Sequence, residues 1–346
     1  MNLRGAVIVL GAGASKGARV PGKRTPPLDA EFLSVAADHF AHKKARGKGR
    51  ESVGVWNDFK ARLKSAGLKF PEVRQWRLEQ LSTFLEARAS LQGMQLGQGR
   101  PRNYGKALDS LKIVVCHVLD REGGTKACEL HKLLFDAARP RAVISFNYDL
   151  IADQSLAELG FLNWRNVEYR CAGFASVPTA KGKTAYKRIT PRTQSESVPL
   201  LKLHGSMHFE KLRRGSGFRL SGVSLPTAEA ASFEFLRVSK HPYLIPPIAA
   251  KIEIKQKELR SRWYAALDHL HDAPAWIIWG YSFPTTDTIS QVLFRTSLTN
   301  NRKPKRVIVV NPDASVASRV CEVCRKVKTE HYPSVERLLL EYGLLS

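Results

Sequence analysis

The stretch AVIVLGAGAS, residues 6–15, sets the expected fold of this chain. Its first five residues are apolar and mostly β-branched, which is typical of a strand buried on both faces of a parallel sheet. The glycines that follow allow a tight turn from strand to helix and let backbone N–H groups approach a pyrophosphate. The stretch therefore predicts a buried first strand and a nucleotide-binding turn, with a plain strand-to-helix turn as the alternative.

Further short apolar runs repeat this pattern along the chain. They are Ala142–Phe146, Leu200–Leu203, Ala275–Trp279 and Arg306–Val310. Helical periodicity falls between the runs, in Gln75–Leu91, Ala107–Leu119, Lys126–Ala138 and Ile252–Leu270. Strands that alternate with helices predict an α/β fold, here a Rossmann-like doubly wound parallel sheet.

The spacing of the runs predicts how the chain is organised. The distance from Gly11 to Ala142 is too long for one crossover, so a mostly helical insertion is expected over residues 31–121. Residues 1–30 and 122–346 then form the Rossmann-like core, with no separate second functional domain. Residues 164–199 and 210–242 are expected to be irregular.

Two helix starts are expected in the last third of the chain. Thr288 followed by Gln291 predicts a capping box that opens a helix through Leu298. Ser334, before an apolar stretch that ends at Gly343, predicts a capped terminal helix.

Composition narrows the class of protein. The chain has 346 residues, of which 43% are hydrophobic, so it can bury a sizeable core. No apolar run approaches the roughly 20 residues that span a bilayer, and no membrane association is expected. Five cysteines do not make a disulfide framework in a chain of this length, so a cytoplasmic location is expected.

The net charge is unusually positive. Lys plus Arg number 55 against 31 for Asp plus Glu, a formal charge of +24. Such a field attracts polyanions, and we expect modest, non-specific nucleic acid binding that weakens with salt. A host with a basic proteome would explain the same charge. The densest basic tracts are His42–Arg50, Lys181–Arg192 and Arg302–Arg306.

Small or polar residues directly follow each apolar run. Because the carboxyl ends of parallel strands meet at one edge of a doubly wound sheet, where ligands bind, these residues are expected to share a nucleotide cleft. They are Gly11, Ala12, Gly13 and Ser15, then Asn147 and Asp149, then His204, then Gly280 and Ser282, and finally Asn311. The alternatives without a functional role are an Asx-turn at Asn147 and a structural loop histidine at His204.

Two better-known nucleotide motifs are incomplete. The third glycine of G-x-G-x-x-G is replaced by Lys16, and the acidic Asp29 and Glu31 follow no convincing second strand, which disfavours an ordinary dehydrogenase. A P-loop is excluded because Arg24 stands where that motif needs Ser or Thr.

Five motifs, taken in order, resemble those of sirtuin-like proteins. They are GAGAS at 11–15, FNYD at 146–149, KLHGS at 202–206, GYSF at 280–283 and VNPD at 310–313. The sequence looks most like the bacterial sirtuin-like NAD-cleaving domains of anti-phage defence systems. The resemblance covers most of the chain as scattered loops and reaches the helical insertion only through LEQL at 78–81.

This resemblance implies roles for the strand-end residues. Asn147 and Asp149 would match the Asn and Asp of the family's Q-N-I-D stretch near the nicotinamide ribose, with Phe146 in place of Gln. His204 would match the catalytic histidine. The other implied contacts of NAD+ are Gly11, Ala12, Gly13 and Ser15 with the pyrophosphate, Gly280 and Ser282 with the adenosine side, and Asn311 with the adenine ribose.

The three residues implied to be catalytic suit cleavage of the nicotinamide–ribose bond. The leaving group is already a cation, so the reaction needs a positioned water and a base more than a strong acid. Histidine suits the base because its ordinary pKa is near 6.5. Asn147 can hold the water or the ribose, and Asp149 can orient the nicotinamide amide or stabilise positive charge.

Cysteine spacing separates two enzyme classes. Sirtuin deacylases carry a zinc ribbon of two Cys-x-x-Cys pairs, whereas this chain has one pair, Cys321 and Cys324. We therefore expect no metal, and water rather than acyl-lysine as the acceptor. The expected enzyme is an NAD+ glycohydrolase that consumes NAD+ as its substrate and releases nicotinamide and ADP-ribose.

Other interpretations stay open. The chain would also suit a non-catalytic subunit that senses NAD or ADP-ribose, or an NAD-dependent deacylase or ADP-ribosyltransferase. By resemblance it would form a homo-oligomer and act in anti-phage defence by depleting NAD. A separate trigger protein, such as an Argonaute-like protein or a hexameric ATPase, would then keep its basal activity low.

Overall fold

The structure is a computed structural model of the 346-residue chain. It describes residues 3–18, 24–45, 50–93, 103–161, 173–178, 184–189, 198–211, 218–220, 241–245, 257–284, 287–298, 306–324 and 327–345.

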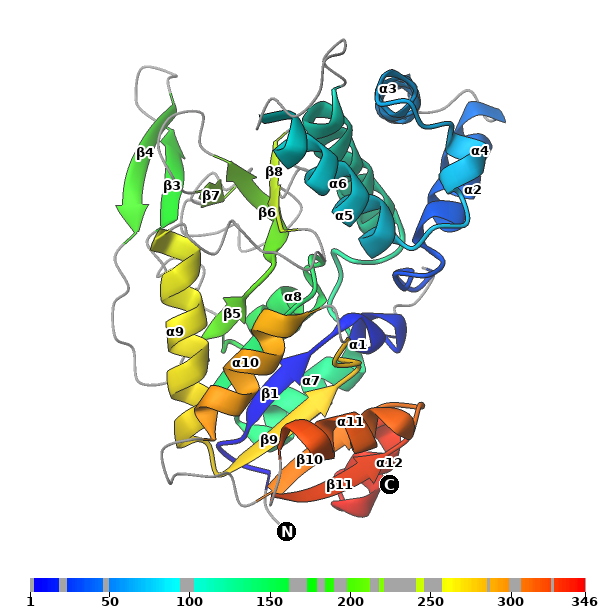
Figure 1. The fold of residues 1–346 in the computed structure, drawn as a ribbon. Helices are drawn as coiled ribbons and strands as arrows, with labels where there is room; N and C mark the ends of the chain where they lie inside the picture. The colour runs from blue at the N-terminus through cyan, green and yellow to red at the C-terminus, as the bar shows by residue number, and fades with distance from the viewer. Residues whose placement is uncertain are drawn as a thin grey trace.

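The centre of the molecule is a six-stranded sheet in which every pair of neighbours is parallel (Figure 1). Its order is β11-β10-β9-β1-β2-β5. The strands are β1 (Val7–Leu10), β2 (Ala142–Ser145), β5 (Leu200–Lys202), β9 (Ala275–Trp279), β10 (Arg306–Val310) and β11 (Lys328–Tyr332). The predicted Rossmann-like doubly wound sheet is confirmed. Only β11 was not expected, because this edge strand is polar and partly exposed.

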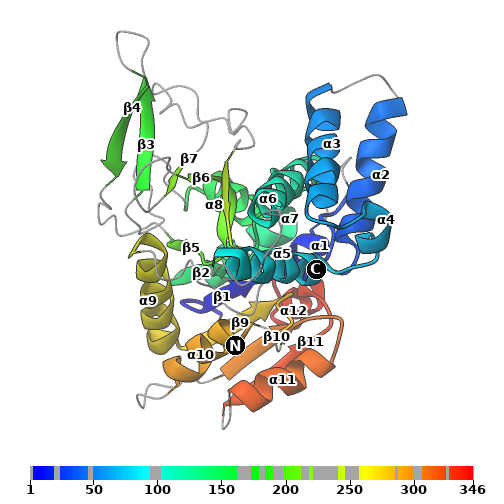
Figure 2. The ribbon, with the colours of Figure 1, turned by 45° about the horizontal axis from the view of Figure 1, so that its top comes forward.

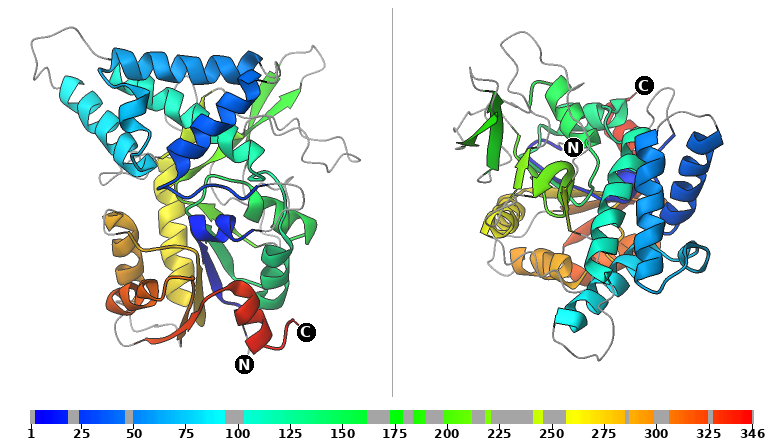
Figure 3. Two further views of the ribbon diagram at one scale, coloured as in Figure 1. Left: turned by 90° about the vertical axis from the view of Figure 1, so that its right-hand side faces the viewer. Right: turned by 90° about the horizontal axis from the view of Figure 1, so that it is seen from above.

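Alternate residues of β1 enter two different apolar cores. Ile8 and Leu10 pack with α7 (Glu129–Ala138), α8 (Ile151–Glu158) and α12 (Val335–Glu341). Val7 and Val9 pack with α9 (Lys257–Asp272), α10 (Thr288–Ser297) and α11 (Ser315–Val323). Helices thus cover both faces of the sheet, which explains why its central strands are continuously apolar (Figure 3).

Helices fill the stretch for which the sequence predicts an insertion. After the short α1 (Ala12–Lys16) come α2 (Phe32–Ala45), α3 (Arg50–Ser65), α4 (Phe70–Val73), α5 (Leu78–Gly93) and α6 (Tyr104–Arg121). They build a third apolar cluster around Phe59 and Leu111, which also takes in Met207 and Leu244 from later in the chain. The helices lie together in Figure 2. The division into core and insertion stays a prediction.

A second sheet has strands within both stretches that were expected to be irregular, so that expectation was wrong for residues 173–178, 184–189 and 218–220. Its order is β4-β3-β7-β6-β8, formed by β3 (Gly173–Pro178), β4 (Thr184–Ile189), β6 (Gly205–Lys211), β7 (Phe218–Leu220) and β8 (Pro242–Leu244). These strands are short and most carry polar residues, so they give no apolar run. Their pairing is decided by partners distant in the sequence.

The helix starts agree only in part with the sequence patterns. The residue that caps α10 is Asp287, whose carboxylate accepts the Ser290 N–H, so the predicted capping box of Thr288 was wrong. Aspartate is among the strongest N-cap residues and takes the position one residue earlier. Ser334 caps α12 as predicted, and Gly343 follows with φ of +66°.

The surface features named from the sequence are only partly visible. Of the three basic tracts, the structure describes residues 42–45, 50, 184–189 and 306. None of the described helices is both long and apolar enough to cross a lipid bilayer.

Candidate functional site

One cavity of about 820 Å³ lies at the carboxyl ends of β1, β2, β5, β9 and β10. From β1 the chain runs to β2 and β5 on one side, and later returns to β9 on the other side of β1. The cavity therefore lies at the point where the strand order reverses, which is where open α/β sheets bind ligands.

The cavity wall contains all ten residues that the sequence selected. They are Gly11, Ala12, Gly13, Ser15, Asn147, Asp149, His204, Gly280, Ser282 and Asn311. The shared wall follows from the parallel sheet, which carries the end of every strand to the same edge. The individual roles of these residues stay predictions.

The glycine turn fits tightly against the loop after β9. A Cβ on Gly13 would lie 2.8 Å from Gly280 Cα, and Gly280 itself has φ of +65°. The N–H of Gly11 donates to Trp279 O at 3.0 Å and that of Gly13 to Gly280 O at 2.9 Å. In this structure both amides hold the two loops together, so the glycines serve close packing as well as the turn.

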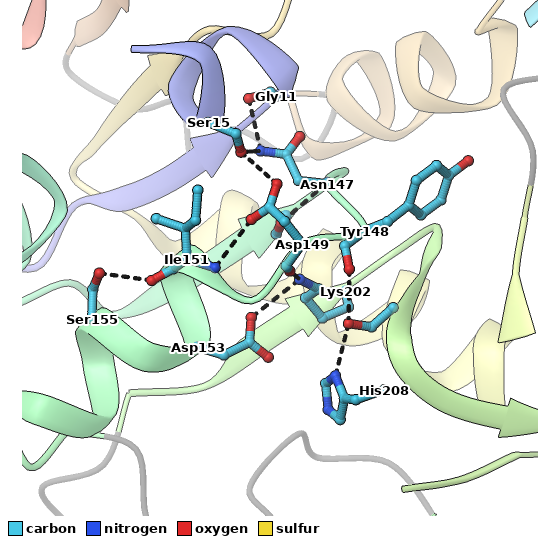
Figure 4. A network of polar contacts seen from close by, with 12 residues as sticks. Gly11, Ser15, Asn147, Tyr148, Asp149, Ile151, Asp153, Ser155, Lys202 and His208 are labelled. Atoms are coloured by element: carbon cyan, nitrogen blue, oxygen red, sulfur yellow. Dashed lines mark hydrogen bonds and ion pairs between the residues drawn. The ribbon is translucent and has the colours of Figure 1, made fainter. Parts of the chain in front are cut away.

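The polar side chains at the ends of β1 and β2 form one buried network (Figure 4). Asn147 Nδ2 donates to Gly11 O and to Ser15 Oγ, both at 2.8 Å. Ser15 Oγ in turn donates to Asp149 Oδ2 at 2.5 Å, and Asp149 Oδ1 accepts the Ile151 N–H at 3.1 Å. The network fixes the side chains of residues 15, 147 and 149 relative to one another.

This bonding limits what each group can offer a ligand. Both hydrogens of the Asn147 amide are used, so its oxygen is the atom left to accept a hydrogen bond from water or a ribose hydroxyl. The Ser15 hydroxyl donates its one hydrogen to the Asp149 carboxylate. A contact between Ser15 and a phosphate, as the resemblance implies, would need that hydrogen bond to be exchanged.

Burial makes the charge on Asp149 costly. Desolvation raises the pKa of this carboxyl above 3.8, and nearby Lys202, the Ser15 hydroxyl and the Ile151 N–H only partly oppose it. Its ionised form therefore destabilises the folded state relative to the unfolded chain. That cost is absent well below pH 3.8, grows as the pH rises from 3.8 to the folded-state pKa, and is constant above that pKa.

An Asp149→Asn variant should accordingly gain stability relative to wild type as the pH increases. Urea unfolding of both proteins between pH 3 and 7.5, a range that includes the ordinary pKa of 3.8, would measure the difference. We expect the variant's free energy of unfolding, minus that of wild type, to become more positive toward pH 7.5. A constant or falling difference would contradict the raised pKa.

A buried ion pair between Lys202 and Asp153 lies next to this network and supports it. Lys202, on β5, is completely buried; its Nζ donates to Asp149 O and lies 3.1 Å from Asp153 Oδ2 (Figure 4). Arg262, also buried, donates to Lys202 O at 3.2 Å. No role was predicted for Lys202, although a lysine inside the apolar run LLKL was a signal for a buried cation.

Beside Lys202, residues of β6 hold the backbone of the same loop. Ser206 Oγ donates to Tyr148 O at 3.2 Å and lies 2.9 Å from His208 Nδ1. Burial lowers the pKa of His208 to about 3, so this imidazole is neutral and serves as a structural hydrogen-bonding group.

His204 lies in an aromatic corner of the cavity. Its ring meets Phe146 edge-on at 5.0 Å, and Phe146 stacks on Tyr281 at 4.3 Å. Its Nε2 faces Asp287 Oδ2 at 3.6 Å, an ion-pair distance slightly longer than a hydrogen bond. Asp287 follows β9 by eight residues and precedes α10. It was not predicted as a site residue, because no local sequence pattern links it to His204.

The two acidic residues that fitted no dinucleotide pattern have structural partners. Asp29 accepts the Glu79 N–H at 2.8 Å and the Arg77 Nε–H at 2.7 Å, which fixes the start of α5 on the cavity wall. Glu31 pairs with Lys16 at the end of the glycine turn. Residues 19–23 of the loop between them lie outside the described part.

The two thiols of the single Cys-x-x-Cys pair differ in burial. Cys324 is buried, which raises its pKa to about 12, and Cys321 lies exposed. Within the described ranges, no group of three or more His, Cys, Asp or Glu side chains is placed to hold a metal ion.

The fold resembles solved structures of Sir2 proteins. One is a mutant Sir2 homologue in complex with 2′-O-acetyl ADP-ribose, at 12% identity and a TM-score of 0.46, covering 98% of this chain and 90% of that one. A Sir2 homologue–NAD complex shares 10% identity at a TM-score of 0.42, covering 98% and 87%. At these values the similarity says nothing about activity.

Comparison by sequence finds no such relative. No family model matches the chain. No curated protein matches it either. What stands is the class of molecule: an α/β protein with a Rossmann-like parallel sheet and a cavity at its switch point.

Proposed function

We propose that this protein is an NAD+ glycohydrolase, which cleaves the nicotinamide–ribose bond to give nicotinamide and ADP-ribose. The observation that carries the proposal is the cavity at the switch point, in which Asn147, Asp149 and His204 line one wall. Its volume of about 820 Å³ suits a ligand larger than a mononucleotide fragment, since ligand pockets span roughly 300–1,000 Å³.

The proposed binding mode runs along the strand ends. The pyrophosphate would lie at the glycine turn, and the adenosine would extend over the loops after β9 and β10, toward Ser282 and Asn311. The nicotinamide end would then lie at the opposite side, beside Asn147, Asp149 and His204. This direction follows the order of the sheet, in which β10 and β9 flank β1 on one side and β2 and β5 on the other.

The chemistry uses these side chains as follows. The bond between ribose C1′ and the nicotinamide nitrogen breaks, and its electron pair stays on the nitrogen, so nicotinamide leaves neutral. The Asp149 carboxylate stabilises the positive charge that develops on the ribose. Asn147 Oδ1 accepts a hydrogen bond from one O–H of the attacking water. The water oxygen bonds to C1′, and the proton of its other O–H passes to His204.

Water rather than an acyl-lysine is the proposed acceptor. The chain has one Cys-x-x-Cys pair instead of the two that build a sirtuin zinc ribbon. Deacylation coupled one for one to NAD+ consumption would contradict this choice.

Nicotinamide release from NAD+ by the purified protein tests the proposal. We expect His204→Ala to reduce the rate by about 100-fold to 10,000-fold, the range typical of a lost general base. Asn147→Ala should cost at least about 100-fold, as the loss of a positioned polar group does. Wild type and variants should be measured alone and with DNA, RNA or host lysate, because a trigger is expected.

Matched controls separate the site from general damage. His271→Ala and Asn103→Ala change the same residue types at a helix end and a helix start away from the cavity wall, and should keep wild-type turnover. Turnover that survives both cavity substitutions would overturn the proposal.

One observation favours a second function, a subunit that binds the nucleotide without consuming it. The Asn147 amide hydrogens and the Ser15 hydroxyl are already engaged within the protein. A cleft whose polar groups are already hydrogen-bonded within the protein is suited to binding a nucleotide without cleaving it. Calorimetric binding of NAD+ or ADP-ribose, with no nicotinamide released under any condition, would favour this function.

The proposed setting is a bacterial defence effector in the cytoplasm. NAD depletion would kill the infected cell, an abortive infection, so basal turnover should be low and a separate trigger or partner should raise it. A homo-oligomer and non-specific nucleic acid binding belong to the same proposal. The net charge of +24 supports the latter, which should weaken steeply with salt.

A further inference from the structure

The carboxylate facing the candidate base comes from a part of the chain with no motif. Asp287 lies at the start of α10, 83 positions after His204 in the sequence, and both line the cavity. The two side chains are almost completely buried, with 9% and 7% of their surface exposed. Water screens such a pair little, so the carboxylate acts strongly on the imidazole.

Asp287 is held in place by two further hydrogen bonds. Its Oδ1 accepts the Ser290 N–H at 3.2 Å, and its Oδ2 accepts the Tyr281 hydroxyl at 2.9 Å. Oδ2 is also the atom that faces His204 Nε2 at 3.6 Å. Helix capping thus orients the carboxylate, and the stacked rings of Phe146 and Tyr281 set the distance between Asp287 and the imidazole.

We infer that Asp287 is a positioning residue for His204. An ionised carboxylate only accepts hydrogen bonds, so it selects the tautomer in which Nε2 carries the proton. Nδ1 then keeps the lone pair and is the basic nitrogen of the ring. Hydrogen bonds at such sites often shorten once the substrate is bound, which would bring the 3.6 Å pair into bonding range.

The role in catalysis rests on the proposed function, whereas the choice of tautomer does not. Asp287→Asn tests both. Because the cap needs an acceptor at the Oδ1 position, the asparagine oxygen takes that place and its NH₂ group faces Nε2. A donor there reverses the tautomer and leaves the proton on Nδ1.

The measurement is NMR of protein labelled with ¹⁵N in its histidine rings, at a pH well above the ordinary imidazole pKa of about 6.5. The His204 signals are those missing from His204→Ala. We expect the Nε2–H tautomer in wild type and the Nδ1–H tautomer in Asp287→Asn. Tyr281→Phe is the matched control, since it removes a hydrogen bond to the same carboxylate but keeps its charge, and it should retain the wild-type tautomer.

Steady-state kinetics complete the test. Asp287→Asn should lower kcat at least tenfold, by less than His204→Ala does, with KM for NAD+ changed less than about threefold. An unchanged tautomer in Asp287→Asn overturns the inference, and so does a reversed tautomer with unchanged kcat. A reversed tautomer in a protein that releases no nicotinamide supports the pairing and refutes the hydrolase.

Discussion

Replacing Gly280 by alanine should lower the free energy of unfolding by about 2–5 kcal/mol. The residue has φ of +65°, which costs an L-amino acid about 1–2 kcal/mol. Its Cβ would also lie closer than 3.0 Å to the backbone N of Ala14 and the backbone C of Gly13. Backbone cannot move aside as a flexible side chain can, so overpacking adds about 1–3 kcal/mol.

Urea unfolding of Gly280→Ala measures this loss, and two glycines supply controls. Gly343 has a similar φ of +66° with open space around it. Gly343→Ala should therefore lose only the unfolding free energy that the positive φ costs an alanine. Gly54 lies inside α3 with nothing within 4 Å, so Gly54→Ala should raise stability by about 0.5–1 kcal/mol. Equal losses at positions 280 and 343 would contradict the close approach of the two loops.

The same substitution should also disturb the candidate site. Gly280 O accepts the Gly13 N–H, so forcing the loops apart breaks a bond that shapes the cavity floor. Any protein that remains folded is expected to bind NAD+ weakly, and calorimetry on the folded fraction would measure the change.

Replacing Lys202 by methionine should cost about 3–5 kcal/mol of unfolding free energy. The side chain is fully buried, and its loss would remove the cation that lies 3.1 Å from the Asp153 carboxylate, which is also fully buried. Breaking a buried pair in this way is far more damaging than removing both charges, because the remaining charge stays out of water with that compensation lost.

The double variant Lys202→Met with Asp153→Asn tests the cause. It should recover most of the lost stability, since neither charge is left unpaired. Arg141→Met is the control: it breaks an ion pair of 2.9 Å with Asp272 at the surface and should cost no more than about 1 kcal/mol. A double variant as unstable as Lys202→Met would show that packing, not charge, dominates.

These two positions illustrate what local sequence signals can and cannot give. Gly280 was selected as a site residue because it follows a predicted strand, but its contact with Gly13 needs the pairing of β1 with β9. Lys202 lay within a quoted motif and was given no role, because its partners Asp149 and Asp153 lie about 50 positions away. Distance along the chain hides such pairs from pattern analysis.

The two sheets show the same division. The parallel sheet was predicted from five apolar runs, because strands buried on both faces are apolar at nearly every position. The second sheet was missed, because short, largely polar strands such as β4 depend on neighbours for their hydrogen bonds and leave little trace in composition.

The sequence by itself determined the central strands, the glycine turn and the ten residues at the strand ends, because burial on two faces and a strand-to-helix turn both impose local residue choices. Only the tertiary structure decided that Asp287 faces His204, that Lys202 supports the Asn147–Asp149 loop, and that Asn147 spends both amide hydrogens within the protein. Those contacts join residues 53 to 136 positions apart, and the energy of a buried polar pair depends on distance in space.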